Sequence, residues 1–166
     1  RRLHRVRALV DAVVVGAGTV AADNPRLTVR QVEGRNPVRV VLDPKGRLGA
    51  DRHVFTDGAA RTLVARPARG GRTGTPVDGS ELLVPVNDAG VFEPAALVAA
   101  LRDLGYRRIL IEGGGTTVSR FVQAGVVDRL HVTVAPILIG SGRHGLTLAP
   151  IPSLDDALRP RSRQFR

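Results

Sequence analysis

Two short apolar runs, each followed by glycine, constrain the fold of this 166-residue chain more than any other feature. The run Asp11–Val15 (DAVVV) precedes Gly16, and the run Arg108–Glu112 (RILIE) precedes three consecutive glycines. Continuous apolar runs of this length are typical of strands buried on both faces, as in parallel sheets covered by helices on either side. The pattern therefore predicts an α/β domain.

Other elements are predicted from apolar periodicity and from glycine and proline breakers. Helices are expected at Arg1–Leu9, from Pro94 at an N1 position to Leu104, and around Thr117–Ala124. Further strands are expected at Val38–Asp43, His53–Phe55, Thr62–Ala65, Leu82–Val86, Arg129–Ala135 and Ile137–Ile139, with a brief extended stretch at Leu27–Arg30. Arg66–Glu81 carries no periodicity and predicts a surface loop. The order of elements predicts one domain with a mixed, mostly parallel sheet.

The formal net charge of +10 suggests a nucleic-acid partner, but its distribution argues against one. Lys45 is the only lysine, and the arginines are scattered along the chain. With one Tyr, four Phe and no Trp, the chain has too few aromatic side chains for a base-stacking surface. A single Arg69–Arg72 segment (RGGR) resembles an RNA-binding box but does not repeat. We therefore interpret the charge as compositional background plus a few arginines with specific roles.

The segment Gly16–Ala21 matches the dinucleotide-binding fingerprint G-x-G-x-x-A. Asp43 ends the next predicted strand, where a ribose-binding acid would be expected. That fingerprint needs a long helix after the glycines, whereas Asp23-Asn24-Pro25 predicts a turn soon after them. We therefore expect no Rossmann turn at this position.

The segment Glu112–Gly115 is a stronger candidate for ligand binding. One glycine would satisfy a plain strand-to-helix turn, whereas three favour close approach of the backbone to an anion. Thr116, Thr117 and Ser119 can either cap the helix or bond a phosphate oxygen. Glu112, at the carboxyl end of its strand, is either a ligand contact or a carboxylate stabilised by the helix dipole.

Several common chemistries lack their motifs. The four histidines are dispersed, which argues against a metal site, and without cysteine there is no thiolate nucleophile or disulfide. Neither G-x-S-x-G nor the G-x-x-x-x-G-K-[ST] phosphate loop occurs. No apolar run reaches the ~20 residues of a membrane span. A bound cofactor must therefore carry any difficult chemistry.

Three segments together resemble the reductase domain of riboflavin biosynthesis, the C-terminal half of the bifunctional bacterial deaminase/reductase. They are DAVVVGAGTVAADNPRLTVR, NPVRVVLD and ILIEGGGTTVSRFVQAGVVDRLHVTVAPILIGSGRHGL, within a resemblance from about Arg7 to Leu148. The resemblance implies a three-layer dihydrofolate-reductase-like fold. It implies NADPH-dependent reduction of the ribosyl group of 5-amino-6-(5-phosphoribosylamino)uracil, or its 2,5-diamino precursor, to the ribityl product. A cytoplasmic homodimer is also implied.

The resemblance assigns candidate site residues by matching motifs. The NADPH contacts it implies are Thr19, Asp23, Pro44, Gly114, Gly115, Thr116, Thr117, Val118, Ser119 and Arg120. The substrate contacts it implies are Arg7, Leu27, Arg30 and Glu112. Arg7 and Arg30 would offer guanidinium groups to the ribose phosphate. Glu112 would accept hydrogen bonds from the pyrimidine or ribose, and either Glu112 or a water would be the general acid.

Two departures from the resemblance are expected to matter. Members of the family begin with a strand carrying an S-L-D-G-like segment and end in a further strand. We expect residues 1–166 to be a single reductase domain that lacks both strands and has no deaminase half. Three alternatives stay open: another pteridine- or dihydrofolate-reducing enzyme of the superfamily, a non-catalytic nucleotide-binding module, or a basic RNA-binding module.

Overall fold

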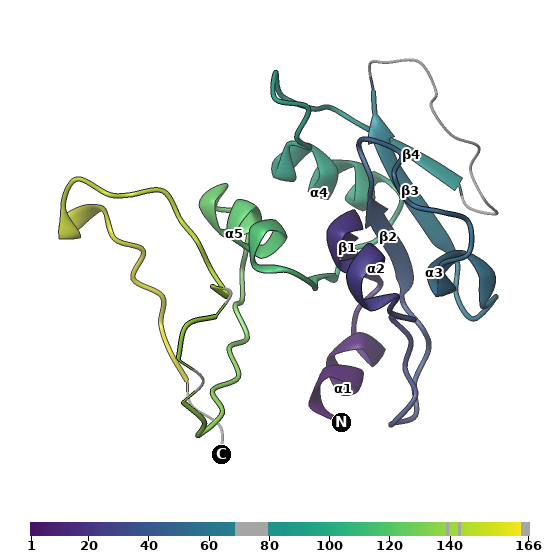
Figure 1. Ribbon diagram of the computed structural model, residues 1–166, viewed down its shortest axis with the longest axis horizontal. Helices are drawn as coiled ribbons and strands as arrows, with labels where there is room; N and C mark the ends of the chain where they lie inside the picture. The colour runs from purple at the N-terminus through teal and green to yellow at the C-terminus, as the bar shows by residue number, and fades with distance from the viewer. Residues whose placement is uncertain (69–79, 139, 143, 164–166) are drawn as a thin grey trace.

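The computed structural model describes residues 1–68, 80–138, 140–142 and 144–163 (Figure 1). The predicted RGGR segment lies outside them. The elements are α1 (Arg2–Ala8), β1 (Ala12–Gly16), α2 (Ala17–Asp23), β2 (Val38–Leu42), α3 (His53–Thr56), β3 (Thr62–Pro67), β4 (Ser80–Val84), α4 (Pro94–Asp103), β5 (Ile109–Ile111), α5 (Gly115–Gln123) and a 3-10 turn at Leu154–Asp156. None of the helices in the described residues is long and apolar enough to cross a membrane.

The five strands form one parallel sheet in the order β4-β3-β2-β1-β5. Strand β1 is flanked on both sides, so that Ala12 is in register with Val38 of β2 and with Ile109 of β5. The chain moves outward from β1 through β2, β3 and β4, and then returns to the other side of β1. Sheets of this kind bind ligands at the carboxyl ends of the strands where the order reverses. The ends of β1 and β5 mark that point.

Helices cover both faces of the sheet, as the three-layer prediction requires. On one face, Leu97 and Leu101 of α4 and Phe121 of α5 share a core with Val14 and Val40. On the other face, Val20 of α2 and Val54 of α3 share a core with alternate strand residues, namely Val13, Val15 and Val41. The alternation along β1 explains why its whole run is apolar: each face of the strand meets a layer of helices.

The predicted strand at His53–Phe55 is wrong, because these residues form the single turn α3. Asn24 holds the start of this turn: its side-chain oxygen accepts the His53 amide at 2.9 Å, and its carbonyl contacts His53 Nδ1. Val54 then enters the core. A tertiary contact from a distant loop overrides the weak strand propensity of this short segment.

The predicted strands at 129–135 and 137–139 do not form: no strand is assigned in residues 129–138, and residue 139 lies outside the described residues. Instead the C-terminal arm, defined as the described part of 129–163, runs beyond α5 on the side away from the sheet (Figure 1). Leu130, Val132 and Val134 are 45, 68 and 85% exposed. A strand needs a hydrogen-bonded neighbour, and the arm lies away from β5. The five described strands are all parallel, where a mixed, mostly parallel sheet was predicted.

Candidate functional site

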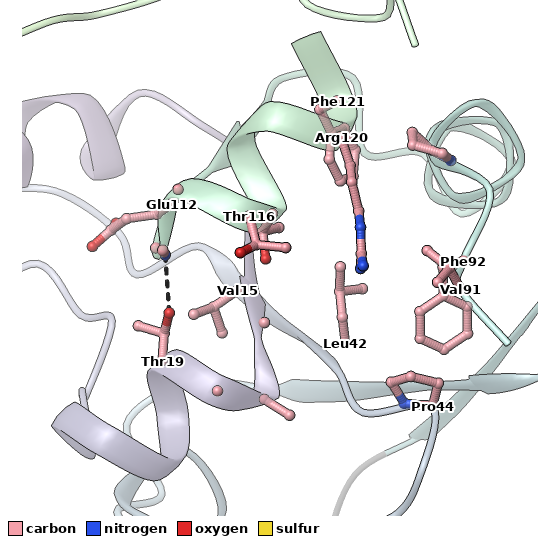
Figure 2. A pocket seen from close by; sticks show the side chains of 18 of the residues that line it. Val15, Thr19, Leu42, Pro44, Val91, Phe92, Glu112, Thr116, Arg120 and Phe121 are labelled. Atoms are coloured by element: carbon pink, nitrogen blue, oxygen red, sulfur yellow. Dashed lines mark hydrogen bonds between the residues drawn. The ribbon is translucent and has the colours of Figure 1, made fainter. Parts of the chain in front are cut away.

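A cavity of about 1170 Å³ lies at the carboxyl ends of β1, β2 and β5. Gly16, Leu42 and Glu112, at or just beyond these strand ends, all contribute to its wall. Figure 2 shows Glu112 at one end and Pro44 and Phe92 at the other. The cavity therefore occupies the position at which the strand order predicts a ligand.

The glycine loop between β5 and α5 is tied to α2 by a hydrogen bond. The Gly114 amide donates to Thr19 Oγ1 at 3.0 Å, drawn as the dashed line in Figure 2. Gly113 has a φ of +127°, and a Cβ there would lie 3.0 Å from the same hydroxyl oxygen. A side chain at Gly113 would be strained and would push Thr19 away. The Thr19 hydroxyl still has its own proton to donate.

The third glycine of the loop packs against the C-terminal arm. A Cβ on Gly115 would collide with the carbonyl oxygens of His144 and Gly145. The arm then runs along α5, because the Thr147 amide donates to Ser119 Oγ and the Ala149 amide donates to a glutamine of the helix, each at 2.8 Å. Glycine at position 115 therefore serves contact within the chain, beside any contact with a ligand.

The start of α5 brings polar groups to the cavity. The predicted cofactor residues that line it are Thr19, Asp23, Pro44, Gly114, Gly115, Thr116, Thr117 and Arg120. Arg120 extends from α5 toward Leu42 across the hollow (Figure 2). Val118 and Ser119 are not part of the wall; Ser119 is buried and holds the arm. The first-turn amides of a helix have no carbonyl partner within it, so those of Gly115 and Thr116 can bind an anion.

On the substrate side, Arg7 and Glu112 are bonded to each other. Arg7 Nε donates to Glu112 Oε2 at 2.9 Å, and Nη2 donates to Oε1. Nη1 donates to the Thr28 carbonyl at 3.1 Å, which leaves Arg7 5% exposed. Glu112 reaches the cavity wall, but Arg7 does not.

Leu27 and Arg30 lie on the segment that follows α2. Leu27 is buried, lines the cavity and has a φ of +57°, in place of the predicted extended stretch. Arg30 is exposed and is not part of the wall, while its amide donates to His4 Nδ1 at 3.1 Å. Burial, followed by the charges of Arg7 and Arg30, lowers the pKa of His4 below 6.5. A neutral imidazole is what this contact requires, because Nδ1 accepts the hydrogen bond.

The loop after β2 adds cationic residues that no sequence motif indicates. Asp43 is 1% exposed, and its oxygens accept the amides of Arg47 and Leu48 at 3.1 Å and the Arg66 guanidinium at 3.3 Å. The Asp43 carboxylate therefore stabilises the turn after β2. This structural role agrees with the expectation that the segment Gly16–Ala21 is not a Rossmann turn. Lys45 and Arg47, on that turn, line the cavity. Their position directly after a buried parallel strand is the one feature of the sequence that indicates a place in the ligand site.

The balance of charge in the cavity favours anionic ligands. Three cationic residues line the cavity, namely Lys45, Arg47 and Arg120. The wall also holds two acids, Asp23 and Glu112, and Glu112 is already paired with Arg7. With the amides at the start of α5, these groups suit phosphate oxygens. The volume exceeds the ~300–1,000 Å³ of most small-molecule sites, so it has room for a dinucleotide beside a second ligand.

Comparison with known proteins supplies the context for this cavity. Residues 1–161 match the family described as the RibD C-terminal domain. The chain is 37% identical over 163 residues to 2,5-diamino-6-ribosylamino-4(3H)-pyrimidinone 5′-phosphate reductase of Archaeoglobus fulgidus, covering 89% of this chain and 71% of the relative. The reductase of the same name from Methanothermobacter thermautotrophicus is 36% identical over 168 residues, covering 96% and 76%.

Two solved structures share the architecture. Acinetobacter baumannii RibD superposes with a TM-score of 0.75 at 25% identity, covering 95% of this chain and 44% of that one. The Thermotoga maritima diaminohydroxyphosphoribosylaminopyrimidine deaminase/5-amino-6-(5-phosphoribosylamino)uracil reductase gives 0.60 at 35% identity, covering 73% and 32%. The chain thus spans less than half of each of these longer proteins.

Proposed function

The chain belongs to the RibD C-terminal domain family, and on that basis we propose that it is an NADPH-dependent reductase acting on a ribosylaminopyrimidine 5′-phosphate. The substrate is 5-amino-6-(5-phosphoribosylamino)uracil or its 2,5-diamino precursor, and the product carries a ribityl chain. The observation that carries the proposal is the cavity at the reversal of strand order. It joins a glycine-rich helix start, suited to phosphates, to an acid that can accept hydrogen bonds from a pyrimidine or ribose.

The residues of the cavity fit a phosphorylated dinucleotide. We assign the amides of Gly115 and Thr116 and the Thr117 hydroxyl to its phosphates, with Arg120 supplying charge. Gly114, whose amide donates to Thr19, lines the cofactor side of the cavity. Thr19, Asp23 and the backbone at Pro44 complete the cofactor side. We assign no direct contact to Val118 or Ser119. When bound, the nicotinamide supplies hydride.

The net reaction adds hydride to the ribosyl C1′, breaks the C1′–O4′ bond and places a proton on O4′, giving the ribityl chain and oxidised cofactor. The protein holds the two reactants in a productive orientation, which can lower the activation barrier by several kcal/mol, up to about 11. We assign the substrate side to Leu27 and Glu112, which line the cavity. We assign the phosphate contact to Arg30, which is exposed outside the cavity wall. The Glu112 carboxylate, held in a bidentate ion pair, acts as a hydrogen-bond acceptor. We therefore assign donation of the proton to O4′ to a water molecule.

Cytoplasmic location and a homodimeric state are further parts of the proposal, taken from the resemblance. Light scattering across a concentration series would measure the oligomeric state. A monomer at every concentration would contradict the homodimer and leave the assignment of the reaction unaffected.

The decisive experiment follows NADPH absorbance with the purified chain and each candidate substrate. Oxidation with either ribosylaminopyrimidine phosphate, and none with dihydrofolate, is expected. Oxidation with dihydrofolate alone would transfer the chain to the pteridine-reducing branch of the superfamily. NADPH fluorescence titration provides a binding measurement that does not depend on turnover. Absence of both binding and turnover would overturn the proposal.

A further inference from the structure

Helix α1 is held in place by polar contacts. Its two buried residues are His4 and Arg7, 8 and 5% exposed, one turn apart. Its leucine, Leu3, is 44% exposed, and Leu9 just after the helix is 64% exposed. A surface helix of a globular protein ordinarily buries an apolar stripe. The buried face of α1 is therefore specialised for particular hydrogen-bond partners.

The partners of both residues belong to the substrate side of the cavity. Arg7 bonds the Glu112 carboxylate through Nε and Nη2, and bonds the Thr28 carbonyl through Nη1. His4 accepts the amide of Arg30. One turn of helix thus fixes Glu112 on the cavity wall. It also fixes both ends of the segment 28–30, which carries the candidate substrate contact Arg30.

We propose that Arg7 is a positioning residue: with His4, it makes α1 a bracket that fixes the Glu112 carboxylate and the backbone of residues 28–30 for the substrate. The inference rests on the proposed function. Three of the five guanidinium N–H groups of Arg7 have partners within the chain, so positioning is a role of Arg7 beside the phosphate contact that the resemblance implies.

The geometry explains why the bracket affects the substrate side more than the cofactor side. Glu112 lies where β5 ends, so its backbone is fixed, but a glutamate side chain has rotatable bonds of its own. A bidentate guanidinium removes that freedom and orients both oxygens. The cofactor contacts assigned to Gly115 and Thr116 are held by α5, and the loop before α5 is held by the bond from Gly114 to Thr19, independently of α1.

The test compares Arg7→Gln with Arg5→Gln, an exposed arginine of the same helix. We expect Arg7→Gln to lower kcat with the pyrimidine phosphate by roughly 10- to 100-fold, since a misplacement of about 1 Å can cost 10²-fold. NADPH affinity should stay within about 2-fold, and Arg5→Gln should resemble wild type on both measures. The double variant Arg7→Gln/Glu112→Gln should lose less activity than the product of the two single losses, because the two residues act as one unit.

A dephosphorylated substrate separates positioning from phosphate binding. If Arg7 positions Glu112, activity is lost with the unphosphorylated ribosylaminopyrimidine as well as with its 5′-phosphate. A loss confined to the phosphorylated compound would overturn the inference, as would folded Arg7→Gln with wild-type kcat. Fully multiplicative losses in the double variant would overturn it as well. If Arg7→Gln does not fold, Arg7→Lys is measured in the same assays, with partial loss expected since lysine keeps the charge and loses the fork.

Failure of the proposed function would look different. In that case wild type would oxidise NADPH with neither pyrimidine, and calorimetry would detect no binding of either. The interaction between Arg7 and Glu112 would then be measured by a double-mutant cycle on the free energy of unfolding. Coupling of about 10-fold or more in the unfolding equilibrium supports the pair, and additive effects overturn it.

Discussion

Thr19 Oγ1 accepts the amide of Gly114 at 3.0 Å, joining two glycine motifs that stand 95 residues apart. Thr19 belongs to the segment that mimics a dinucleotide fingerprint, and Gly114 belongs to the loop that opens α5. The two motifs are therefore opposite sides of one cavity, and the hydrogen bond sets the distance between them.

Thr19→Val keeps the shape of the side chain and removes the acceptor. An intramolecular hydrogen bond contributes about 1 kcal/mol, so we expect roughly 5-fold weaker NADPH binding, because the Gly114 loop loses its anchor. Fluorescence titration of NADPH measures this. Thr56→Val on α3, where the hydroxyl bonds Arg52 O at 3.2 Å, is the matched control and should leave affinity unchanged. Equal affinities for the two variants would contradict the role of Thr19.

Gly115→Ala should displace the arm from α5, because the new Cβ would meet the carbonyl oxygens of His144 and Gly145. Amide hydrogen exchange at Thr147 and Ala149 reports the displacement, since both amides donate to side chains of that helix. We expect both to exchange faster. Gly18→Ala on α2 is the control: a Cβ there meets nothing within 4 Å, and exchange in the arm should not change.

Arg39 should be among the residues most costly to remove. It is 1% exposed and donates to Thr62 Oγ1 at 3.0 Å, to Asp57 at 2.7 Å and to two backbone carbonyls. Arg39→Met would leave the Asp57 carboxylate buried without its cation, which costs about 3–5 kcal/mol in comparable pairs. Urea unfolding measures the loss. Arg39→Met/Asp57→Asn should recover part of it; no recovery would show that the ion pair is not the cause.

Stability should fall below neutral pH because of His4. Burial, with the charges of Arg7 and Arg30, lowers its pKa in the folded chain, so the unfolded chain binds more protons in that range. The resulting stabilisation is complete above 6.5 and is lost as pH falls toward the lowered value. Comparing unfolding at about pH 7.5 and about pH 5.5 tests this, and His4→Gln should flatten the difference. His131→Gln, in the exposed arm, should not.

Asp57 contributes at lower pH. Burial raises its pKa, but the hydrogen bonds from Arg39 and from the Ala59 amide, with the charges of Arg39 and Arg26, together outweigh that effect and the net shift of the pKa is downward. Its contribution to stability is therefore present above 3.8 and lost as pH falls through the folded value. Acid unfolding of Asp57→Asn should accordingly show a weaker pH dependence in that range than that of wild type.

The sequence predicted those elements whose signal is local. The apolar run of β1 and the Pro94 start of α4 both appear where periodicity placed them. The Arg7–Glu112 pair could not be predicted, because it joins residues 105 positions apart and no motif records which arginine a carboxylate will face. Residues 129–135 illustrate the opposite limit: period-two apolarity indicates a strand, but pairing depends on a neighbouring edge that local pattern does not specify.

That unpaired stretch governs how the protein must be handled. Leu130, Val132 and Val134 present an alternating apolar surface to water at the start of the C-terminal arm. Such surfaces template strand addition between molecules and lead to aggregation. Aggregation of this chain will therefore increase with protein concentration and with salts that strengthen apolar contact, so rates should be compared only between samples at equal, low protein concentration.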